Sequence, residues 1–479
     1  MTRFMQRAPL GALAAAMLLT GCASFKGIDS HSSLRSNESV GLAANAGPSF
    51  ALNTEWWRDF GDDNLNRLVA QALAGNPNLK IAQARLAKAQ AATEGARAAL
   101  LPQVGGEADS QRQKFSAHNI YPPPIGGSTL TLNTLQLNGS WEIDFFGKNQ
   151  AALNGALSAA QAAQADAEAA RILLATNVAR AYFTLARLDD ELDVAKRTLA
   201  QRDQSFKLVQ DRVNAGLDSQ LELKQSEGAI PETRQQIEAL NEQAEIARHA
   251  IAALIGVGNQ PVAIAPAIAN VKAMALPSQI PANLLGQRAD IAAARLRVEA
   301  AGYDVKNAKA QFYPNVNLVA FAGLSSIGFS RLVSAGSEQF GIGPAIRLPI
   351  FEGGHLRANL RGKDADLDAA IESYNAAVLD AIRDTADSIA SAQSIVRQQS
   401  EQKQAQSAAE TAYDLSVQRY KAGLGTYLNV LAAESAVLTQ RRLAVDLAAR
   451  ALDTQVALIR ALGGGWRDSN ATVATNEAK

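Results

Sequence analysis

The sequence contains two copies of one long segment, and this repeat constrains the fold more than any other feature. Arg-Val-Asn-Ala-Gly-Leu at 212–217 returns as Arg-Tyr-Lys-Ala-Gly-Leu at 419–424. At nearly the same offset, Leu-Pro-Gln-Val at 101–104 returns as Tyr-Pro-Asn-Val at 313–316. The offset is far longer than the roughly 20–50 residues of a solenoid repeat. The sequence therefore predicts two copies of one large module, related by pseudo-symmetry.

Long segments of both copies carry apolar residues at every seventh position. One series is Val178, Leu185, Leu192, Leu199, Phe206 and Val213, with Leu188, Ala195 and Val209 three positions after members of it; another is Leu424, Leu431, Leu438, Val445, Leu452 and Ile459. Heptad spacing is typical of helices that pack as coiled coils. Residues 148–213 hold no proline and a single glycine, which predicts one helix on the order of 100 Å long. Residues 354–421 have the same character, and Gly216 and Gly423 suit left-handed caps that lead into returning helices.

Between these helices the period changes to two. Apolar Leu135, Leu137, Trp141, Ile143 and Phe145 alternate with polar residues, and Phe340, Ile342, Ile346, Leu348 and Ile350 share one parity in the second copy. Such alternation is typical of membrane β-strands, with one face toward lipid and one toward water. We expect partner strands at about 103–115 and 315–324, with exposed loops at 121–124 and 325–336. Arg347 should lie on the water-facing side, because an arginine toward lipid costs about 2–4 kcal/mol at the midplane.

Four strands per chain are too few to close a barrel, and hydrocarbon offers no partner to the backbone groups of an open sheet edge. Other copies of the chain must therefore complete the sheet. Two copies would give eight strands with a filled interior, whereas three would give twelve around a water-filled bore, and we expect three. The predicted fold class is an α+β membrane protein: long antiparallel coiled-coil helices form an α-helical barrel, and four β-strands per protomer contribute to a trimeric twelve-stranded β-barrel.

The N-terminus predicts export and lipid attachment. Arg3 and Arg7 precede an apolar stretch too short to span a bilayer, so 1–21 is interpreted as a signal peptide. Cys22, the only cysteine, follows directly and resembles the lipidated cysteine of a bacterial lipobox. Ala23 in place of Asp suggests, by the rule for that class, sorting to the outer membrane of a Gram-negative cell. Residues 22–50, rich in Ser, Gly and Asn, are predicted to form a lipidated flexible tether.

Composition excludes several other functions. Lys and Arg number 46, as do Asp and Glu, so the formal net charge is zero and no nucleic-acid partner is expected. The four histidines are scattered without metal-ligand spacing, and no nucleophile, base and orienting group can be proposed together. We expect no enzymatic activity, no cofactor and no metal. After the signal peptide, no apolar run is long enough for a transmembrane helix.

Several motifs, taken in order, resemble a known family. They are Trp56-Trp57-Arg58-Asp59-Phe60-Gly61-Asp62, Trp141-Glu142-Ile143-Asp144-Phe145-Phe146-Gly147-Lys148, and Leu284-Leu285-Gly286-Gln287-Arg288-Ala289-Asp290-Ile291 followed by Phe312-Tyr313-Pro314. They look like TolC-type outer membrane efflux proteins, and the lipobox resembles the lipoprotein (NodT/OprM-like) branch. The resemblance implies a homotrimer in outer membrane lipid with its helical tunnel in the periplasm. It also implies two partners, a periplasmic adaptor (membrane fusion) protein and an inner-membrane transporter.

The predicted domain order follows the repeat. A first structural repeat at 51–260 is joined by a connecting segment at 261–282 to a second repeat at 283–462. Residues 463–479 are predicted to form a disordered C-terminal tail.

The resemblance also gives roles to the two Ala-Gly-Leu turns. They would form hairpin tips that dock on the adaptor through Arg212, Gly216, Leu217, Arg419, Gly423 and Leu424; exposed leucines suit a partner surface. The periplasmic aperture or gate would consist of Asp218, Glu222, Tyr420 and Asn429, with a solvated helix face as the alternative. Relatives often carry acids where Asn429 and Ala432 stand here, so we expect weaker attraction of cations at this aperture.

The sequence thus predicts a passive outer membrane channel of a tripartite efflux system. It would conduct small molecules, such as drugs and toxic compounds, from the adaptor and pump to the exterior. One alternative is the outer membrane duct of a type I protein secretion system on the same scaffold. Another, of a different class, is a periplasmic coiled-coil scaffold lipoprotein, which would need no alternating strands.

Overall fold

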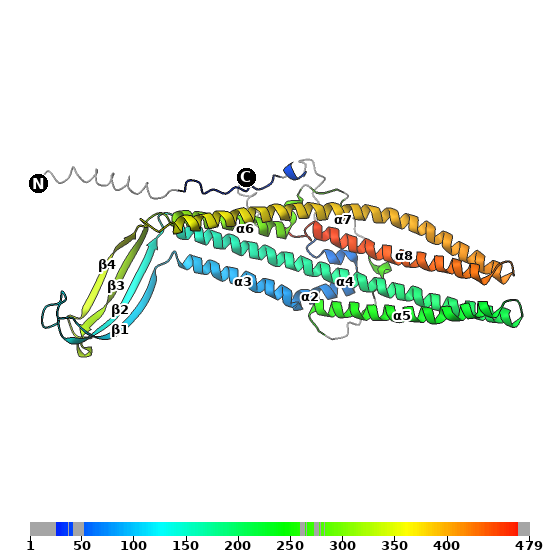
Figure 1. Cartoon of the computed structure of the whole chain (residues 1–479), viewed down its shortest axis with the longest axis horizontal. Helices are drawn as coiled ribbons and strands as arrows, with labels where there is room; N and C mark the ends of the chain where they lie inside the picture. Colours follow the sequence, from blue (N-terminus) through cyan, green and yellow to red (C-terminus); the bar gives the residue numbers. More distant parts are fainter. Residues whose placement is uncertain are drawn as a thin grey trace. The chain divides into compact units, whose positions relative to one another are not determined.

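The computed structural model describes residues 25–36, 38–41, 52–258, 264, 266–272, 277, 279–281 and 283–467 (Figure 1). The predicted signal peptide, the predicted lipidation site Cys22 and residues 468–479 lie outside this part of the chain.

The described chain passes twice through a similar succession, in which helix is followed by two strands and then by two long helices (Figure 1). The first copy contains α2 (Asp63–Gly75), α3 (Pro77–Ala98), β1 (Gln103–Lys114), β2 (Thr129–Ile143), α4 (Lys148–Asn214) and α5 (Gln220–Ile255). The second contains α6 (Ala289–Ala310), β3 (Asn315–Ile327), β4 (Glu338–Arg347), α7 (His355–Lys421) and α8 (Tyr427–Ala461). Short 3-10 helices are η1 (Glu38–Val40), η2 (Trp56–Phe60), η3 (Ile268–Asn270), η4 (Leu284–Gln287) and η5 (Phe329–Arg331). Long helices and a sheet of four antiparallel strands confirm the predicted α+β fold class.

The two longest helices match the prediction closely. α4 and α7 each contain 67 residues, and neither contains proline. At 1.5 Å per residue each is on the order of 100 Å long. No helix in the described part of the chain is both long and apolar enough to cross a membrane.

The chain divides into two compact units. Unit 1 comprises residues 1–34, 85–163 and 294–374, and unit 2 comprises residues 35–84, 164–293 and 375–479. Each unit draws on both copies of the repeat, because α3, α4, α6 and α7 all begin in one unit and end in the other. The predicted boundaries follow the repeat along the chain, whereas the compact units cut across it.

The sheet belongs to unit 1 and has the order β1-β2-β3-β4. Val104 pairs with Gly139, Gly139 with Ala320, and Ala320 with Ile342, so these four positions share a face. This mainly apolar face carries Val104, Leu135, Leu137, Trp141, Leu318, Ala320, Ala322, Phe340, Ile342 and Ile346, with Arg112, Lys114, Asn133 and Glu338 toward the loop end of the sheet. The opposite, mainly polar face carries Glu107, Asp109, Gln136, Asn138, Glu142, Asn315, Asn317, Gln339 and Arg347, together with the apolar Leu130, Leu132, Val319, Phe321 and Ile327. The pairing confirms the alternation seen in the sequence and places Arg347 on the polar face.

Strand ends differ from the prediction where the pattern weakens. β2 begins at Thr129, well before Leu135, because its first residues pair with the polar end of β1. Leu130 and Leu132 alternate there with polar residues, but with the opposite parity to Leu135 and Leu137. Ser325–Ile327, expected in a loop, belong to β3 and pair with β2. Phe145, expected on the strand, lies in the turn after β2, where the Asp144 carboxylate accepts a hydrogen bond from the Gln150 N–H at 2.7 Å and so fixes the start of α4. Leu348 and Ile350 likewise lie beyond the end of β4.

Residues 25–34 form a strap, which corrects the predicted flexible tether for this stretch. Ile28 is 3% exposed and packs in a cluster with Phe312 and with Leu360 of α7. Asp368 of α7 accepts hydrogen bonds from three groups of the strap: the hydroxyl of Ser30 at 2.5 Å, the N–H of His31 at 3.0 Å and the N–H of Ser32 at 3.1 Å. The polar composition predicted a flexible segment, but Phe25 and Ile28 pack in an apolar cluster and Asp368 binds the residues that follow.

Unit 2 contains the largest apolar core. Trp56 and Phe60 of η2 are fully buried, and Phe60 meets Phe183 of α4 edge to face at 5.2 Å between ring centroids. The same core includes Val178, Leu185 and Leu188 from the heptad stripe of α4. The heptad residues of α4 therefore pack in the core of unit 2, as the sequence predicted, and aromatic residues fill the space beside them.

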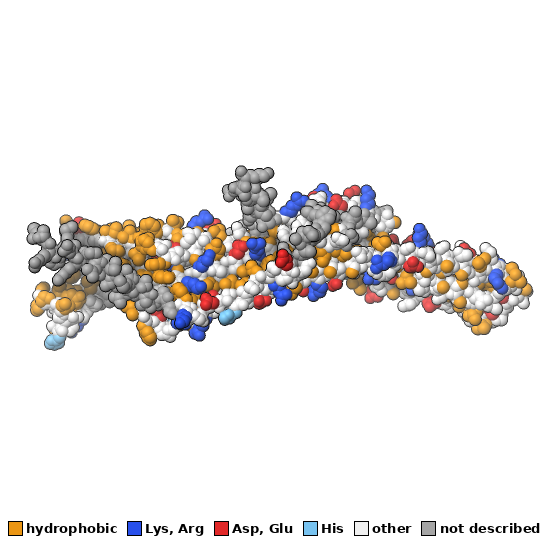
Figure 2. Space-filling model, turned by 90° about the horizontal axis from the view of Figure 1, so that it is seen from above, with side chains coloured by type: hydrophobic (Ala, Val, Ile, Leu, Met, Phe, Trp, Pro, Cys, Tyr) orange, Lys and Arg blue, Asp and Glu red, His pale blue; other side chains and the backbone are white. Residues whose placement is uncertain are grey.

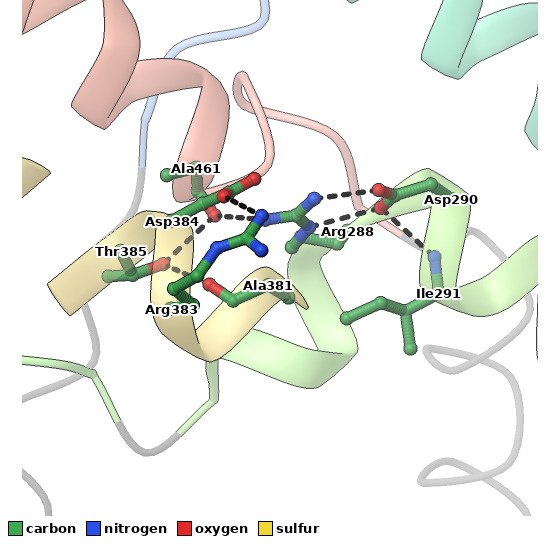
Figure 3. Close-up of polar contacts among 8 residues, drawn as sticks. All are labelled: Arg288, Asp290, Ile291, Ala381, Arg383, Asp384, Thr385 and Ala461. Atoms are coloured by element: carbon green, nitrogen blue, oxygen red, sulfur yellow. Dashed lines mark hydrogen bonds and ion pairs between the residues drawn. The ribbon is translucent and has the colours of Figure 1, made fainter. Parts of the chain in front are cut away.

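A buried arginine joins three helices in unit 2 (Figure 3). Arg288 is 6% exposed and donates hydrogen bonds to both carboxylate oxygens of Asp290, at 3.1 and 2.7 Å. It also donates to the carbonyl oxygen of Ala461, the last residue of α8, at 3.1 Å. The hydroxyl of Thr385 on α7 lies 3.4 Å from the same carbonyl (Figure 3). The beginning of α6 is thus tied to the end of α8, and α7 reaches the same carbonyl oxygen through Thr385.

The first residues of the predicted disordered tail are instead ordered. Gly463, Gly464 and Gly465 are buried and have φ angles of 94°, 57° and 79°. A Cβ at Gly463 would lie 1.9 Å from the carbonyl oxygen of Gln287, and one at Gly465 would lie 2.2 Å from that of Asn53. Only glycine fits these positions, because both the backbone conformation and the space exclude a side chain. The prediction of disorder is therefore wrong for residues 463–467.

Candidate functional site at the helical hairpin tips

The two repeated turns have the same backbone geometry. After α4, the N–H of Leu217 donates to the carbonyl of Arg212 at 2.9 Å, and the N–H of Gly216 donates to that of Val213 at 3.0 Å. After α7, Leu424 donates to Arg419 at 2.8 Å and Gly423 to Tyr420 at 3.0 Å. Gly216 and Gly423 have φ angles of 72° and 73°. Both turns are Schellman motifs, which confirms the left-handed glycine caps predicted from the sequence.

Three side chains meet at the first tip. Arg212 forms a bidentate ion pair with Asp218, at 2.9 Å from Nε to Oδ2 and 3.3 Å from Nη2 to Oδ1. The hydroxyl of Tyr420, which comes from the second hairpin, donates to the same Oδ2. The guanidinium carbon of Arg212 lies 4.6 Å from the centroid of the Tyr420 ring. Arg212, Asp218 and Tyr420, called the tip triad here, therefore link the two hairpins of one chain.

Burial makes this link stronger than an ordinary surface ion pair. The side chains of Arg212 and Asp218 are 13% and 11% exposed, and Tyr420 is 2% exposed. Tyr420 packs in an apolar cluster with Val209 and Tyr427. A partly desolvated, bidentate arginine–carboxylate pair holds its geometry better than an exposed pair, whose contribution is typically about 0–1 kcal/mol.

Within the tip triad, the pKa of each member is shifted in the direction that favours the protonation state needed for its hydrogen bonds. Burial alone would raise the pKa of Asp218, but the hydrogen bonds from Arg212 and Tyr420 outweigh burial and hold that pKa below its ordinary value. The hydrogen bond to Asp218 raises the pKa of Arg212. Burial, and then the hydrogen bond to Asp218, raises the pKa of Tyr420. At neutral pH the triad is therefore a carboxylate, a guanidinium and a neutral phenol.

The second tip lacks this pair although its backbone is the same. The repeat aligns Arg419 with Arg212, but it aligns Gly425 with Asp218. Arg419 is exposed and donates instead to the carbonyl of Leu424 at 3.4 Å. The two tips therefore have the same backbone turn, but only the first has the buried arginine–aspartate ion pair.

Both tips expose leucines. Leu217 and Leu424 are 64% and 70% exposed, and Leu221 and Leu428 one turn further on are exposed to a similar extent. Figure 2 shows hydrophobic side chains on the visible surface of the hairpin ends, at the right of the view. Such side chains at a helix turn contribute nothing to the core of this chain, which leaves them available for contact with another protein.

The remaining predicted gate residues do not join the tip triad. The carboxylate of Glu222 accepts the N–H of Ser219 at 3.0 Å and completes a capping box at the start of α5, and its hydrogen bond with the Ser219 side chain lowers its pKa. Asn429 is exposed in the first turn of α8. Arg212, predicted as a docking residue, lies within the buried triad.

A second buried ionic cluster escaped the sequence analysis. Arg202 of α4 donates to Glu434 of α8 at 3.2 Å, and to the carbonyl of Ala229 and the hydroxyl of Thr233 on α5, both at 2.8 Å. Burial raises the pKa of Glu434, although Arg202 partly offsets that rise. The sequence did carry a signal, because Arg202 follows Leu199, and Glu434 follows Leu431, at the three-residue offset that apolar residues otherwise occupy. Opposite charges at core positions of two heptad stripes indicate a buried pair between the helices.

A sheet with one mainly apolar and one mainly polar face is typical of membrane β-barrel proteins, and long helical hairpins belong to the same chain. The model of the outer membrane efflux protein family matches residues 68–257 and 280–464. The chain therefore belongs to the outer membrane efflux protein family.

Individual relatives agree with this assignment. The fusaric acid resistance protein FusA of Burkholderia cepacia is 37% identical over 366 residues, which cover 74% of this chain and 69% of FusA. The pyoverdine export outer membrane protein OpmQ of Pseudomonas aeruginosa is 31% identical over 427 residues, which cover 88% of this chain and 90% of OpmQ. The crystal structure of the outer membrane protein VceC of Vibrio cholerae superposes with a TM-score of 0.80 at 34% identity, over 86% of this chain and 99% of VceC. The chain is thus an outer membrane efflux protein in sequence and in fold.

The tip triad gives a prediction for Asp218→Asn. The substitution removes the negative charge that Arg212 and Tyr420 share, and should weaken the link between the hairpins by about 1.5–3 kcal/mol. We expect faster hydrogen–deuterium exchange in peptides covering residues 205–225 and 413–430 at pH 7. Because the pKa of Asp218 is lowered in the folded protein, its contribution is complete above the ordinary value of about 4 and is lost as the pH falls through the lowered value.

The difference between wild type and variant should therefore narrow below about pH 4, once exchange is corrected for its intrinsic rate. The matched control is Asp211→Asn, which makes the same change at an exposed position on the same helix. Equal exchange in wild type and Asp218→Asn at pH 7 would contradict the role of the triad.

Proposed function

We propose that this chain works as a trimeric, passive duct of a tripartite efflux system, and that it conducts small molecules across the outer membrane. The observation that carries the proposal is the sheet: one face is apolar, the other is polar, and β1 and β4 each pair with only one neighbour within the described chain. An apolar face suits lipid, a polar face suits water, and outer strands in hydrocarbon require partners.

Closure by further copies follows from these requirements. β1 and β4 are antiparallel through the sheet and keep the same face alternation, so β4 of one copy can pair with β1 of the next without exchanging faces. Three copies supply twelve strands, which leave a bore wide enough for water and solutes, whereas eight strands enclose only side chains. The polar face then lines the bore, with Arg347 in water.

The exposed leucines support a docking role for the tips. Leu217 and Leu424, together with the glycines that shape the turns and the exposed Arg419, form the surface proposed to meet the periplasmic adaptor. The adaptor connects the duct to an inner-membrane transporter, which supplies the energy. The chain itself is assigned no catalytic step, no cofactor and no metal in this scheme.

The tip triad is proposed to act as the gate of the duct. It links the hairpin of α4 and α5 to that of α7 and α8, so the aperture can widen only when these hydrogen bonds break. Glu222 and Asn429, in the first turns of α5 and α8, are proposed to line the aperture without closing it.

The relatives support a small-molecule cargo. FusA is named for fusaric acid resistance and OpmQ for pyoverdine export. Both compounds are small organic molecules. Because this chain is similar to FusA and OpmQ, it is proposed to conduct compounds of that size. The sheet, with its exposed apolar face, argues against the alternative of a coiled-coil scaffold lipoprotein.

Conductance in planar lipid bilayers tests the proposed function. The purified chain should migrate as a trimer and produce stepwise single-channel currents, because a bore lined by a polar face carries ions. A monomeric protein that produces no current would reject the duct and leave the scaffold alternative ahead.

Docking predicts an effect of Leu217→Ser combined with Leu424→Ser. A fully buried leucine contributes about 1.5–3 kcal/mol, so loss of two per protomer should weaken adaptor binding more than tenfold. In a deletion strain complemented with the variant, we expect several-fold lower resistance to the drugs to which the deletion sensitises cells, with trimers unchanged. The control is Leu415→Ser, an exposed leucine on α7 away from the turn. Full resistance in the double variant would speak against docking at the tips.

The lipid anchor at Cys22 is the last part of the proposal. Attached acyl chains contribute about 0.8 kcal/mol for each buried methylene, which suffices for stable anchoring when more than one chain is present. Cells grown with labelled palmitate should transfer label to the wild-type chain but not to Cys22→Ser. Labelling of both proteins would show that Cys22 is not the modified residue.

A further inference from the structure

A hydrogen-bonded band crosses the polar face of the sheet at one level. Glu107 pairs with Gln136, Gln136 with Gly323, and Gly323 with Gln339, so one residue of each strand lies in this row. Gln339 donates to the amide oxygen of Gln136 at 3.0 Å, and Gln136 donates to the carboxylate of Glu107 at 3.2 Å. Asn138 donates to the same carboxylate oxygen at 2.9 Å. Glu107, Gln136, Asn138 and Gln339 are called the polar band here.

Gly323 makes the band continuous. A Cβ at Gly323 would lie 2.3 Å from the carbonyl oxygen of Leu135 and 2.5 Å from the side chain of Gln136, so no other residue fits without movement. Without a side chain on β3, the amide of Gln339 on β4 reaches across to Gln136 on β2. The glycine therefore allows one row of hydrogen bonds to run from β4 to β1.

The band carries a negative charge that the rest of the face does not cancel. Charged residues of the polar face within the four strands are Glu107, Asp109, Glu142 and Arg347. Glu142 forms an ion pair with Lys148 at 2.6 Å and lies six residues along β2 from Gln136 of the band. The carboxylate of Glu107 accepts hydrogen bonds from two neutral amides, which fix its position and bring no compensating positive charge. Asp109 lies two residues along β1 and therefore on the same face.

We propose that the polar band sets the charge preference of the duct, so that cations and neutral polar solutes pass more readily than anions. The inference rests on the proposed trimer, in which three bands join into one ring around the bore. Carboxylates fixed at the wall attract cations over about one Debye length, roughly 30 Å in 0.01 M salt and 3 Å in 1 M salt. Selection at this ring complements the tips, where Asp218 is already paired with Arg212 and Asn429 is uncharged.

Reversal potentials in planar bilayers test the polar band. The wild-type trimer and the double variant Glu107→Gln, Asp109→Asn are compared under a KCl gradient, once near 0.01 M and once near 1 M. The variant should lower the K⁺/Cl⁻ permeability ratio about twofold in the dilute salt and leave it unchanged in the concentrated salt, because screening then hides the ring. Both substitutions keep the size of the side chain, and glutamine at 107 can still accept hydrogen bonds from its neighbours.

The matched control is Glu338→Gln, which removes one carboxylate from β4 on the opposite face of the sheet. It should leave the ratio at the wild-type value. Conducting trimers whose ratio is the same in the double variant and the wild type would overturn the role of the polar band while leaving the duct intact. A wild-type chain that forms no channel would instead overturn the duct itself.

Discussion

The backbone N–H and C=O groups on the outer edges of β1 and β4 need hydrogen-bond partners, and the rest of the structure depends on this need. An unpaired N–H or C=O in hydrocarbon costs several kcal/mol, so a sheet with an apolar face cannot remain open in a membrane. β2 is followed within a few residues by α4, and β4 by α7. In the proposed trimer, the strands that pair between neighbouring copies are β4, which leads into α7, and β1, which follows α3 within a few residues. Closure of the sheet and assembly of the helices would then involve the same three copies.

Residue periodicity predicted most of the fold, and side-chain chemistry at single positions accounts for what it missed. The stripe from Val178 to Val213 and the alternation around Leu137 depend on many residues, so they survive local exceptions. The strap depends on Ile28 and Asp368, which are distant in sequence and unremarkable in composition. The buried glycines at 463–465 looked like a tail because their packing partners, such as Gln287, come from another part of the chain. Long-range contacts made by one or two residues leave no local pattern to read.

The candidate site shows the same limit. Glycine at 216 and 423 predicted both turns, because only the left-handed region of φ allows the cap. Nothing in the repeat indicated that Asp218 would bind Arg212 while Gly425 leaves Arg419 exposed. The two turns have the same backbone conformation, but their side chains form different hydrogen bonds and ion pairs. In the proposed trimer, three chains would present six tips with the same backbone shape. Because the two tips of each chain differ in their side chains, a partner would meet two different surfaces in alternation, with threefold and not sixfold symmetry.

The strap has a consequence for biogenesis. Its hydrogen bonds to Asp368 join residues separated by 336 to 338 positions, so the strap leaves the ribosome long before its partner exists. Contacts of such sequence separation form late, because the chain between them must first be closed into a loop. The strap can therefore be held in place only after α7 has been synthesised. The proposed acylation at Cys22 would then precede the contact with Asp368, so the position of a single aspartate would set the order of the two events.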